Sequence, residues 1–207
     1  MCKRASIIIS LLILTLFSSV ATTQELKYYV SAHGGLAMPL DAETTFTGYP
    51  DTYNFDFDTS PVFGGAVGAA NGPWRSEVEL GYRSHDADAI NGIPLAGTGF
   101  ASDVDILTGL VNVYYDHDIG HALKPFVTAG IGFANIDARL AAAIVGATSD
   151  DTTVLAWQVG AGLNYALSDR FSLEAKYRFL MGSDPEFEIA TSEFRSHDIL
   201  FGVRLGF

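Results

Sequence analysis

Eight segments of this chain alternate between apolar residues and polar or very small ones, as expected for strands with two different faces. Each is about as long as, or longer than, the ~9–11 residues that a tilted strand needs to cross a bilayer. The segments are 26–37, 61–70, 74–83, 103–115, 126–136, 153–167, 171–182 and 195–207. The pattern predicts an all-β protein with eight antiparallel strands.

The connections between these segments differ in length. Asn71-Gly72-Pro73 and Ser168-Asp169-Arg170 are short, and the connection 116–124 is somewhat longer. The long connections are 38–60, 84–102, 137–152 and 183–194. Short turns at one end and long loops at the other are typical of a transmembrane up-and-down β-barrel with periplasmic turns and extracellular loops. An even number of strands places both termini at the periplasmic end.

The two faces of the segments indicate which side meets lipid, because a soluble barrel would also alternate. Aromatic residues stand near the segment ends on the apolar face, as in the two aromatic girdles of a membrane barrel. The predicted lipid-interface aromatics are Trp74, Tyr82, Tyr115, Trp157, Tyr165, Phe171 and Phe207. The other face is rich in glycine, which suits a narrow eight-stranded interior. We therefore expect the apolar face to look outward into a membrane.

Acidic and basic residues are interleaved on the predicted interior face. The expected charge network consists of Arg75, Glu77, Glu79, Arg83, Glu174, Lys176, Arg178, Asp198 and Arg204. Charges in a confined interior are tolerated when they are paired and hydrogen-bonded. The sequence therefore predicts a lumen plugged by salt bridges, which conducts little or nothing.

The N-terminal segment has the pattern of a secretory signal peptide. Lys3 and Arg4 precede an apolar run over 7–17, and Ser19-Val20-Ala21 is a small-x-small cleavage sequence. The apolar run is shorter than the ~20 residues of a membrane-spanning helix. We expect residues 1–21 to be a signal peptide and residues 22–207 to form the barrel domain.

The net charge is concentrated in the long connections. The chain carries −12, and without Lys3 and Arg4 the charge is −14. The four long loops with their strand ends hold all of this excess, and the rest of the chain is balanced. An acidic outer end is not expected to bind nucleic acid, which needs basic patches. We interpret the acidic loop residues as solvated surface charges. Binding of divalent cations or of a cationic partner is the less favoured alternative, because the loops lack the regular ligand spacing of a calcium-binding loop.

Two Ser-His-Asp sequences are candidates for catalytic groups. In Ser196-His197-Asp198 the histidine would point away from both neighbours in a strand, so the three cannot act in series. Ser84-His85-Asp86 lies at the predicted edge of a loop, where its side chains could assemble. The other histidines lack the spacing of metal ligands. We predict no metal, no cofactor and no enzymatic activity.

Three stretches resemble the small OmpA-like, porin-family outer-membrane β-barrels, which include surface antigens and opacity-type proteins of Gram-negative bacteria. These are PFVTAGIGFANID at 125–137, WQVGAGLNYALSDRFSLEAKYRFL at 157–180 and HDILFGVRLGF at 197–207. The resemblance implies an outer-membrane location among lipid and lipopolysaccharide. It also implies that the barrel assembly machinery recognises the last strand through Phe201, Val203, Leu205 and Phe207. This chain ends at the barrel, so the peptidoglycan-binding role of full-length OmpA is not carried over.

The leading functional expectation is a structural or surface-antigen barrel whose acidic loops contact a host or envelope partner. A narrow porin for small solutes is the first alternative. The third is a lipid A-modifying enzyme that uses Ser84, His85 or Asp86, because such enzymes are built on small barrels of this kind.

Overall fold

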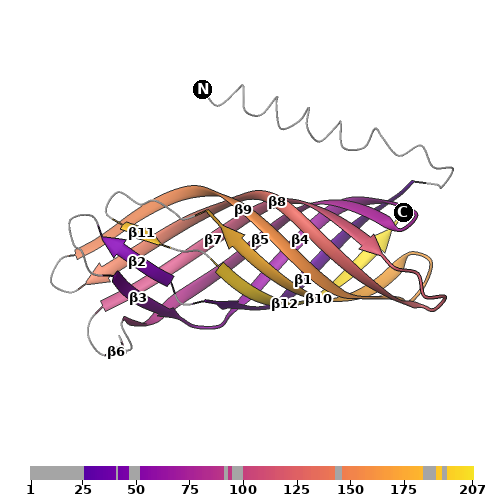
Figure 1. Ribbon diagram of the computed structural model, residues 1–207. Helices are drawn as coiled ribbons and strands as arrows, with labels where there is room; N and C mark the ends of the chain where they lie inside the picture. The colour runs from indigo at the N-terminus through magenta and orange to yellow at the C-terminus, as the bar shows by residue number, and fades with distance from the viewer. Residues whose placement is uncertain are drawn as a thin grey trace, which may run out of the picture.

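The computed structural model describes residues 26–40, 42–46, 52–90, 93–94, 100–142, 146–183, 190–192 and 195–207. The expected signal peptide, residues 1–21, lies outside this part of the chain. No helix among the described residues is long and apolar enough to cross a membrane. The regular structure of the described residues consists of β-strands (Figure 1).

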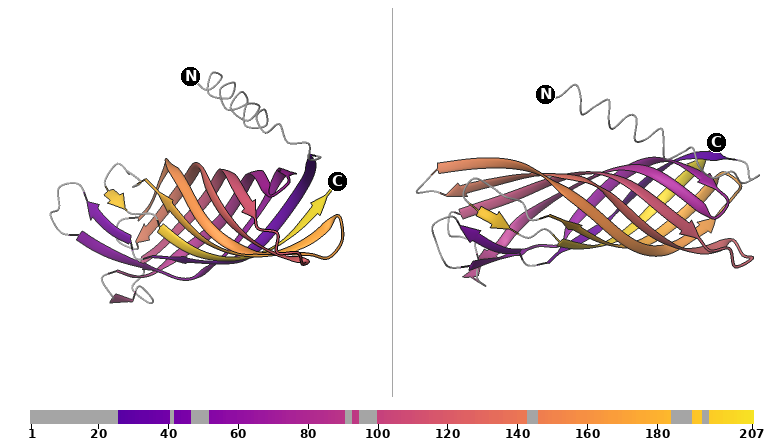
Figure 2. Two further views of the ribbon diagram at one scale, coloured as in Figure 1. Left: turned by 45° about the vertical axis from the view of Figure 1, so that its right-hand side comes forward. Right: turned by 45° about the horizontal axis from the view of Figure 1, so that its top comes forward.

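Eight long strands form a closed cylinder in which each strand is antiparallel to its two neighbours (Figures 1 and 2). The first strand pairs with the last, which closes the barrel. In spatial order they are β1 (Lys27–Pro39), β4 (Ser60–Asn71), β5 (Trp74–Ile90), β7 (Phe100–Asp116), β8 (Leu123–Ala142), β9 (Gly146–Ala166), β10 (Phe171–Gly182) and β12 (Arg195–Gly206). This confirms the predicted eight-stranded antiparallel barrel.

The pairing register sets the tilt and the width of the cylinder. A row of paired residues that leaves β12 at Arg195 passes once around the barrel and returns to β12 at Leu205, ten positions further along. A stagger of this size in eight strands goes with a tilt of about 35–45° and an interior that side chains can fill. Inward-facing glycines make room for the side chains of the neighbouring strands. A Cβ at Gly130, for example, would collide with the side-chain amide oxygen of Asn112 on β7.

The strands are longer than predicted at the loop end. β10 spans the predicted 171–182, whereas β5 continues from the predicted end at 83 to Ile90, and β9 begins at Gly146 instead of 153. Residues 84–90 read SHDADAI, in which the two faces no longer differ clearly in polarity. Strands that rise above a membrane have water on their outer face, so alternation marks only the spanning part.

Short strands also occur where the sequence predicted only loops. Their bounds are β2 (Ala42–Phe46), β3 (Thr52–Phe57), β6 (Ile93–Pro94) and β11 (Ala190–Ser192). Three of them extend the sheet in the order β11–β2–β3–β5, and β6 pairs with β5. They lie together at the loop end of the barrel, on the left in Figure 1.

The short turns at the other end have the local chemistry that their geometry needs. Gly72, with φ of 61°, and Pro73 form the two-residue loop between the paired Asn71 and Trp74, as in a type II′ hairpin. In the β7–β8 turn, the Asp118 carboxylate accepts hydrogen bonds from Lys124 Nζ at 2.7 Å and from the Gly120 amide at 2.8 Å. These two hydrogen bonds, with the one from Lys124 contributing more, hold the pKa of Asp118 below its usual range.

The outer surface of the cylinder is apolar over its middle. Leu80, Phe201 and Val67 are 62%, 64% and 59% exposed, although side chains of this kind are normally buried. A contiguous apolar surface of this extent is not stable in water, and it matches the lipid-facing band of a transmembrane barrel.

Heat modifiability on a gel should report the closed barrel. Unboiled protein in SDS is expected to migrate differently from boiled protein, because the closed backbone hydrogen-bond network resists the detergent. The measurement compares samples heated to increasing temperature before electrophoresis. Identical mobility of boiled and unboiled samples would contradict a closed barrel.

Candidate functional site

The barrel interior gathers the charged residues that the sequence placed on one face. All nine expected network residues lie on inward positions of β5, β10 and β12. Arg83, Arg178 and Asp198 are at most 1% exposed. Unpaired charges at such depth would be very unfavourable, so their partners determine what the interior can do.

Two of the innermost ion pairs, Arg83–Asp198 and Arg178–Glu79, cross the lumen between strands that are not neighbours, and a third joins the neighbouring strands β10 and β12. Arg83 of β5 donates two hydrogen bonds to the Asp198 carboxylate of β12, at 3.0 and 3.1 Å. Arg178 of β10 contacts both Asp198, Nε to Oδ2 at 2.8 Å, and Glu79 of β5, Nη1 to Oε1 at 2.6 Å. The Ser196 hydroxyl donates to Asp198 at 2.6 Å. Each carboxylate in this layer is therefore shared by several donors.

A second cluster centres on Arg75 near the short-turn end. Its Nε and Nη2 donate to the Asp116 carboxylate at 2.7 and 2.9 Å, and its Nη1 lies 2.9 Å from Glu174 Oε1. Arg204 donates to the same Glu174 oxygen at 3.0 Å. The Tyr29 hydroxyl donates to Glu77 at 2.8 Å.

Lys176 and Tyr114 join the two clusters. The Lys176 ammonium donates to the Tyr114 hydroxyl at 3.2 Å and lies 3.6 Å from Glu79 Oε2. The Arg75 guanidinium stacks on the Tyr114 ring with its carbon 4.3 Å from the centroid. The interior therefore holds one connected network that runs along much of the barrel.

Asp116 is a network member that sequence reasoning missed, because it was assigned to the turn after the fourth segment. It lies two positions from Tyr114 on the same face of β7, so extending the alternation by one step would have found it. The cations are Arg75, Arg83, Lys176, Arg178 and Arg204, and the anions are Glu77, Glu79, Asp116, Glu174 and Asp198. With Asp116 the network has equal numbers of charges of each sign.

Apolar side chains also fill the interior, beside the ion pairs and beyond them toward the loop end. Leu110, Leu180 and Leu200 are at most 1% exposed. The described residues form two such clusters. One consists of Ile106, Leu110, Ala134, Ile136, Val154, Ala156 and Leu180, and the other of Ala37, Val62 and Leu200. Alternation along the chain did not predict them, because inward-facing residues were expected to be polar or small. They reduce the room for water beside the ion pairs.

Ser84 and His85 do not come together, which removes an assembly that the sequence had left possible for Ser84-His85-Asp86. β5 continues through these residues, so Ser84 is exposed on the outer surface and His85 is buried inside at 3% exposure. His85 Nδ1 lies 2.7 Å from Ser60 Oγ instead. The side chain of Asp86 lies outside the described part of the structure.

Ser196-His197-Asp198 is divided in the same way, as expected. Ser196 and Asp198 point inward, and His197 Nδ1 lies 2.6 Å from the Tyr177 hydroxyl on the outer surface. In a catalytic triad the histidine hydrogen-bonds both the serine and the aspartate. His197 lies on the opposite face from Ser196 and Asp198, so this segment cannot provide a triad.

The structure places the expected interface aromatics on the outer surface. All seven are between 38% and 74% exposed, and the Trp74 and Tyr115 rings meet edge to face at 5.0 Å. Trp74 and Tyr82 are eight positions apart on β5, as are Trp157 and Tyr165 on β9. Given the rise per residue and the strand tilt, these pairs lie roughly 20 Å apart along the barrel axis, close to the height of an outer-membrane apolar band.

The C-terminal residues expected to form the assembly signal are also on the outer surface. Phe201, Val203, Leu205 and Phe207 are 64%, 43%, 46% and 74% exposed. Phe201, Val203 and Leu205 form an outward row on β12, and Phe207 follows directly after its last residue. Recognition of this row by the assembly machinery stays a prediction.

The structure describes only part of the acidic long loops and their strand ends. Arg139 lies 3.3 Å from both Asp105 and Asp137, and Asp151 is exposed. Asp41, Asp51, Asp184, Glu186, Glu188 and Glu193 lie outside the described residues. Within the part of the chain that can be examined, no group of three or more His, Cys, Asp or Glu side chains is placed to hold a metal ion.

A closed antiparallel cylinder with an apolar belt, aromatic bands and a charged interior defines an integral β-barrel protein of the bacterial outer membrane. The family described as outer membrane protein beta-barrel domain matches residues 9–207, and the chain belongs to this family. The location in the outer membrane of a Gram-negative cell envelope follows from this membership.

Known proteins support the same class. The chain is 25% identical over 179 residues to the outer membrane protein PagN of Salmonella typhimurium, covering 72% of this chain and 74% of PagN. Among solved structures, OprG of Pseudomonas aeruginosa has a TM-score of 0.62 at 16% identity, covering 90% of this chain and 99% of OprG. Neisserial surface protein A has a TM-score of 0.55 at 19% identity, covering 89% of this chain and all of that one. The structural matches bear on the fold alone.

Proposed function

We propose that this protein is a surface-exposed structural barrel that displays acidic extracellular loops and does not conduct solutes. The charge-balanced network inside the lumen is the observation that carries this proposal. Its ion pairs cross the barrel, as between Arg83 and Asp198, so they occupy the space that a pore would need. Partner contact is assigned to the loops because such barrels differ mainly there.

The network supports a plug for energetic reasons. Opening a path would separate Arg178 from Glu79 and Arg83 from Asp198, which face each other across the lumen and are at most 1% exposed. Separating a buried ion pair leaves uncompensated charges and is strongly unfavourable. Apolar residues such as Leu180 narrow the loop-side part further. These features favour the structural barrel over the narrow porin.

Conductance recording in planar lipid bilayers tests the plug. The native monomer is expected to give no steady open-channel current, because its lumen is occupied by paired side chains. A triple variant, Glu79→Ser, Lys176→Ser and Arg178→Ser, replaces three long side chains that meet in the lumen by short ones. It should give frequent openings in the same membranes. A steady current from native protein would refute the plug and favour the porin.

Display of the acidic loops is the second part of the proposal. The long loops with their strand ends hold the whole net charge of the chain after the expected signal peptide. A cationic host or envelope partner would be attracted over about one Debye length, ~8–10 Å at physiological salt. We therefore expect partner binding that weakens as salt concentration rises.

The lipid A-modifying enzyme is disfavoured, because Ser84 and His85 face opposite sides of β5. His85→Ala is expected to leave the lipid A of expressing cells unchanged. Mass spectrometry of lipid A should give one profile for native protein, His85→Ala and an empty vector. A modification present only with the native protein would restore the enzymatic alternative.

A further inference from the structure

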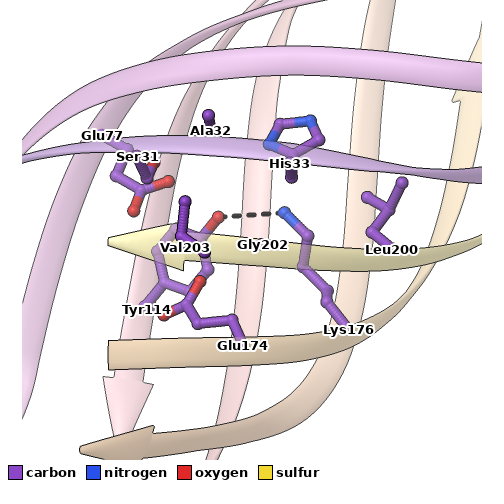
Figure 3. A pocket seen from close by; sticks show the side chains of 10 residues that line it. All are labelled: Ser31, Ala32, His33, Glu77, Tyr114, Glu174, Lys176, Leu200, Gly202 and Val203. Carbon is purple, nitrogen blue, oxygen red and sulfur yellow. Dashed lines mark hydrogen bonds between the residues drawn. The ribbon is translucent and has the colours of Figure 1, made fainter. Parts of the chain in front are cut away.

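A small cavity lies inside the barrel between the two ion-pair clusters (Figure 3). Polar side chains from different strands surround it, among them Glu77 of β5, Tyr114 of β7, and Glu174 and Lys176 of β10. His33 of β1 and Gly202 of β12 also line it. Its free space has room for about one water molecule.

The side chains around this cavity have more hydrogen-bond donors and acceptors than their contacts with one another use. The Lys176 ammonium has three donors, and its hydrogen bond to Tyr114 uses one of them. His33 Nε2 has no hydrogen-bond partner among the described residues and lies 3.6 Å from Glu79 Oε1. Glu174 accepts its two Arg contacts on one oxygen, Oε1. Buried groups of this kind are normally satisfied by ordered water.

The charge balance indicates what kind of ligand fits. The surrounding network already holds equal numbers of acids and bases, so a bound ion would add an uncompensated buried charge. The ligand must also accept from an ammonium and donate to a carboxylate. Water is neutral, small enough, and able to do both.

We propose that this cavity is a binding site for a single ordered water molecule, which bridges Lys176 to the Glu77 or Glu174 carboxylate. The water completes the hydrogen bonding between the innermost ion pairs, which include Glu79, and the cluster around Arg75. His33 borders it and packs over β4, where a Cβ at Gly64 would collide with its ring. This inference concerns the interior and does not depend on what the loops bind.

A crystal structure of the native protein grown in rubidium chloride tests the proposal. We expect one oxygen-sized density peak about 2.6–3.2 Å from Lys176 Nζ and from a carboxylate oxygen, without anomalous signal at the rubidium edge. An anomalous peak in the cavity would mean a cation site. Absence of density, at a resolution where other buried waters are visible, would mean a dry cavity. Either result overturns the proposal.

Matched variants give a second test in solution. Water-selective NMR on the native protein in detergent should show cross-peaks from a long-lived water to backbone amides beside the cavity, including that of Gly202. Ser31 lines the cavity, so Ser31→Ala should keep these peaks and Ser31→Leu should remove them. Loss of the peaks in Ser31→Ala would show that they arise from the serine hydroxyl, and their absence from the native spectrum would contradict the site.

Discussion

Replacing Arg178 with methionine is expected to lower the free energy of unfolding by about 3–5 kcal/mol, the cost of breaking a buried ion pair from one side. Arg178 is fully buried and contacts two carboxylates, Glu79 Oε1 at 2.6 Å and Asp198 Oδ2 at 2.7 Å. Methionine has a similar length but donates no hydrogen bond, so it leaves two acids short of a partner. The penalty comes from those acids more than from the lost contacts.

Equilibrium unfolding in urea, with the protein in lipid vesicles, measures this change through the fluorescence of Trp74 and Trp157. Arg139→Met is the matched control, because Arg139 is 55% exposed and its ion pairs lie at the surface. The control should cost less than about 1 kcal/mol. Adding Glu79→Gln and Asp198→Asn to Arg178→Met should recover part of the loss. An Arg178→Met protein as stable as the control would show that the network is not buried as described.

Placing arginine at Val78 is expected to destabilise the protein by about 2–4 kcal/mol in a bilayer, the cost of a cation at the midplane of a barrel's lipid face. Val78 lies on the outer surface, midway between Trp74 and Tyr82 on β5. The aromatic bands therefore place it at the greatest depth in lipid. The barrel could reduce the penalty only by local thinning of the membrane or by bending the arginine toward the interface.

The same substitution at Ser84 is the depth control. Ser84 lies two positions beyond Tyr82 on the same strand and face, where the penalty should fall to about 0–1 kcal/mol. Both variants are compared with native protein by urea unfolding in vesicles of one lipid. Equal stability of the Val78→Arg and Ser84→Arg proteins would mean that Val78 meets water, and the orientation of the barrel faces would be wrong.

The sequence determined the number of barrel strands and their two faces. A strand has a side-chain period of two, so each spanning segment records in its own residues which side meets lipid and which faces inward. Trp74 and Arg75 are neighbours in sequence, yet one is 50% exposed and the other 1%. The short turns could also be predicted, because Gly and Pro signal them locally, as Gly72 does.

The loop-side structure could not be predicted in the same way. Strands that continue above the membrane, such as 84–90 of β5, do not have lipid on one face and a lumen on the other, so alternation no longer marks them. The assembly of Ser84 with His85, which the sequence left possible, does not occur for this reason, since a continued strand sends them to opposite faces.

Only the tertiary structure decided which acid pairs with which base. Arg83 and Asp198 are 115 positions apart and come from strands that are not neighbours, so their contact depends on closure and on the stagger of ten positions per circuit. The apolar filling near Leu180 and the water-sized cavity beside Lys176 depend on the same register. Alternation is a local property of each strand, whereas contacts across the lumen depend on all eight strands together.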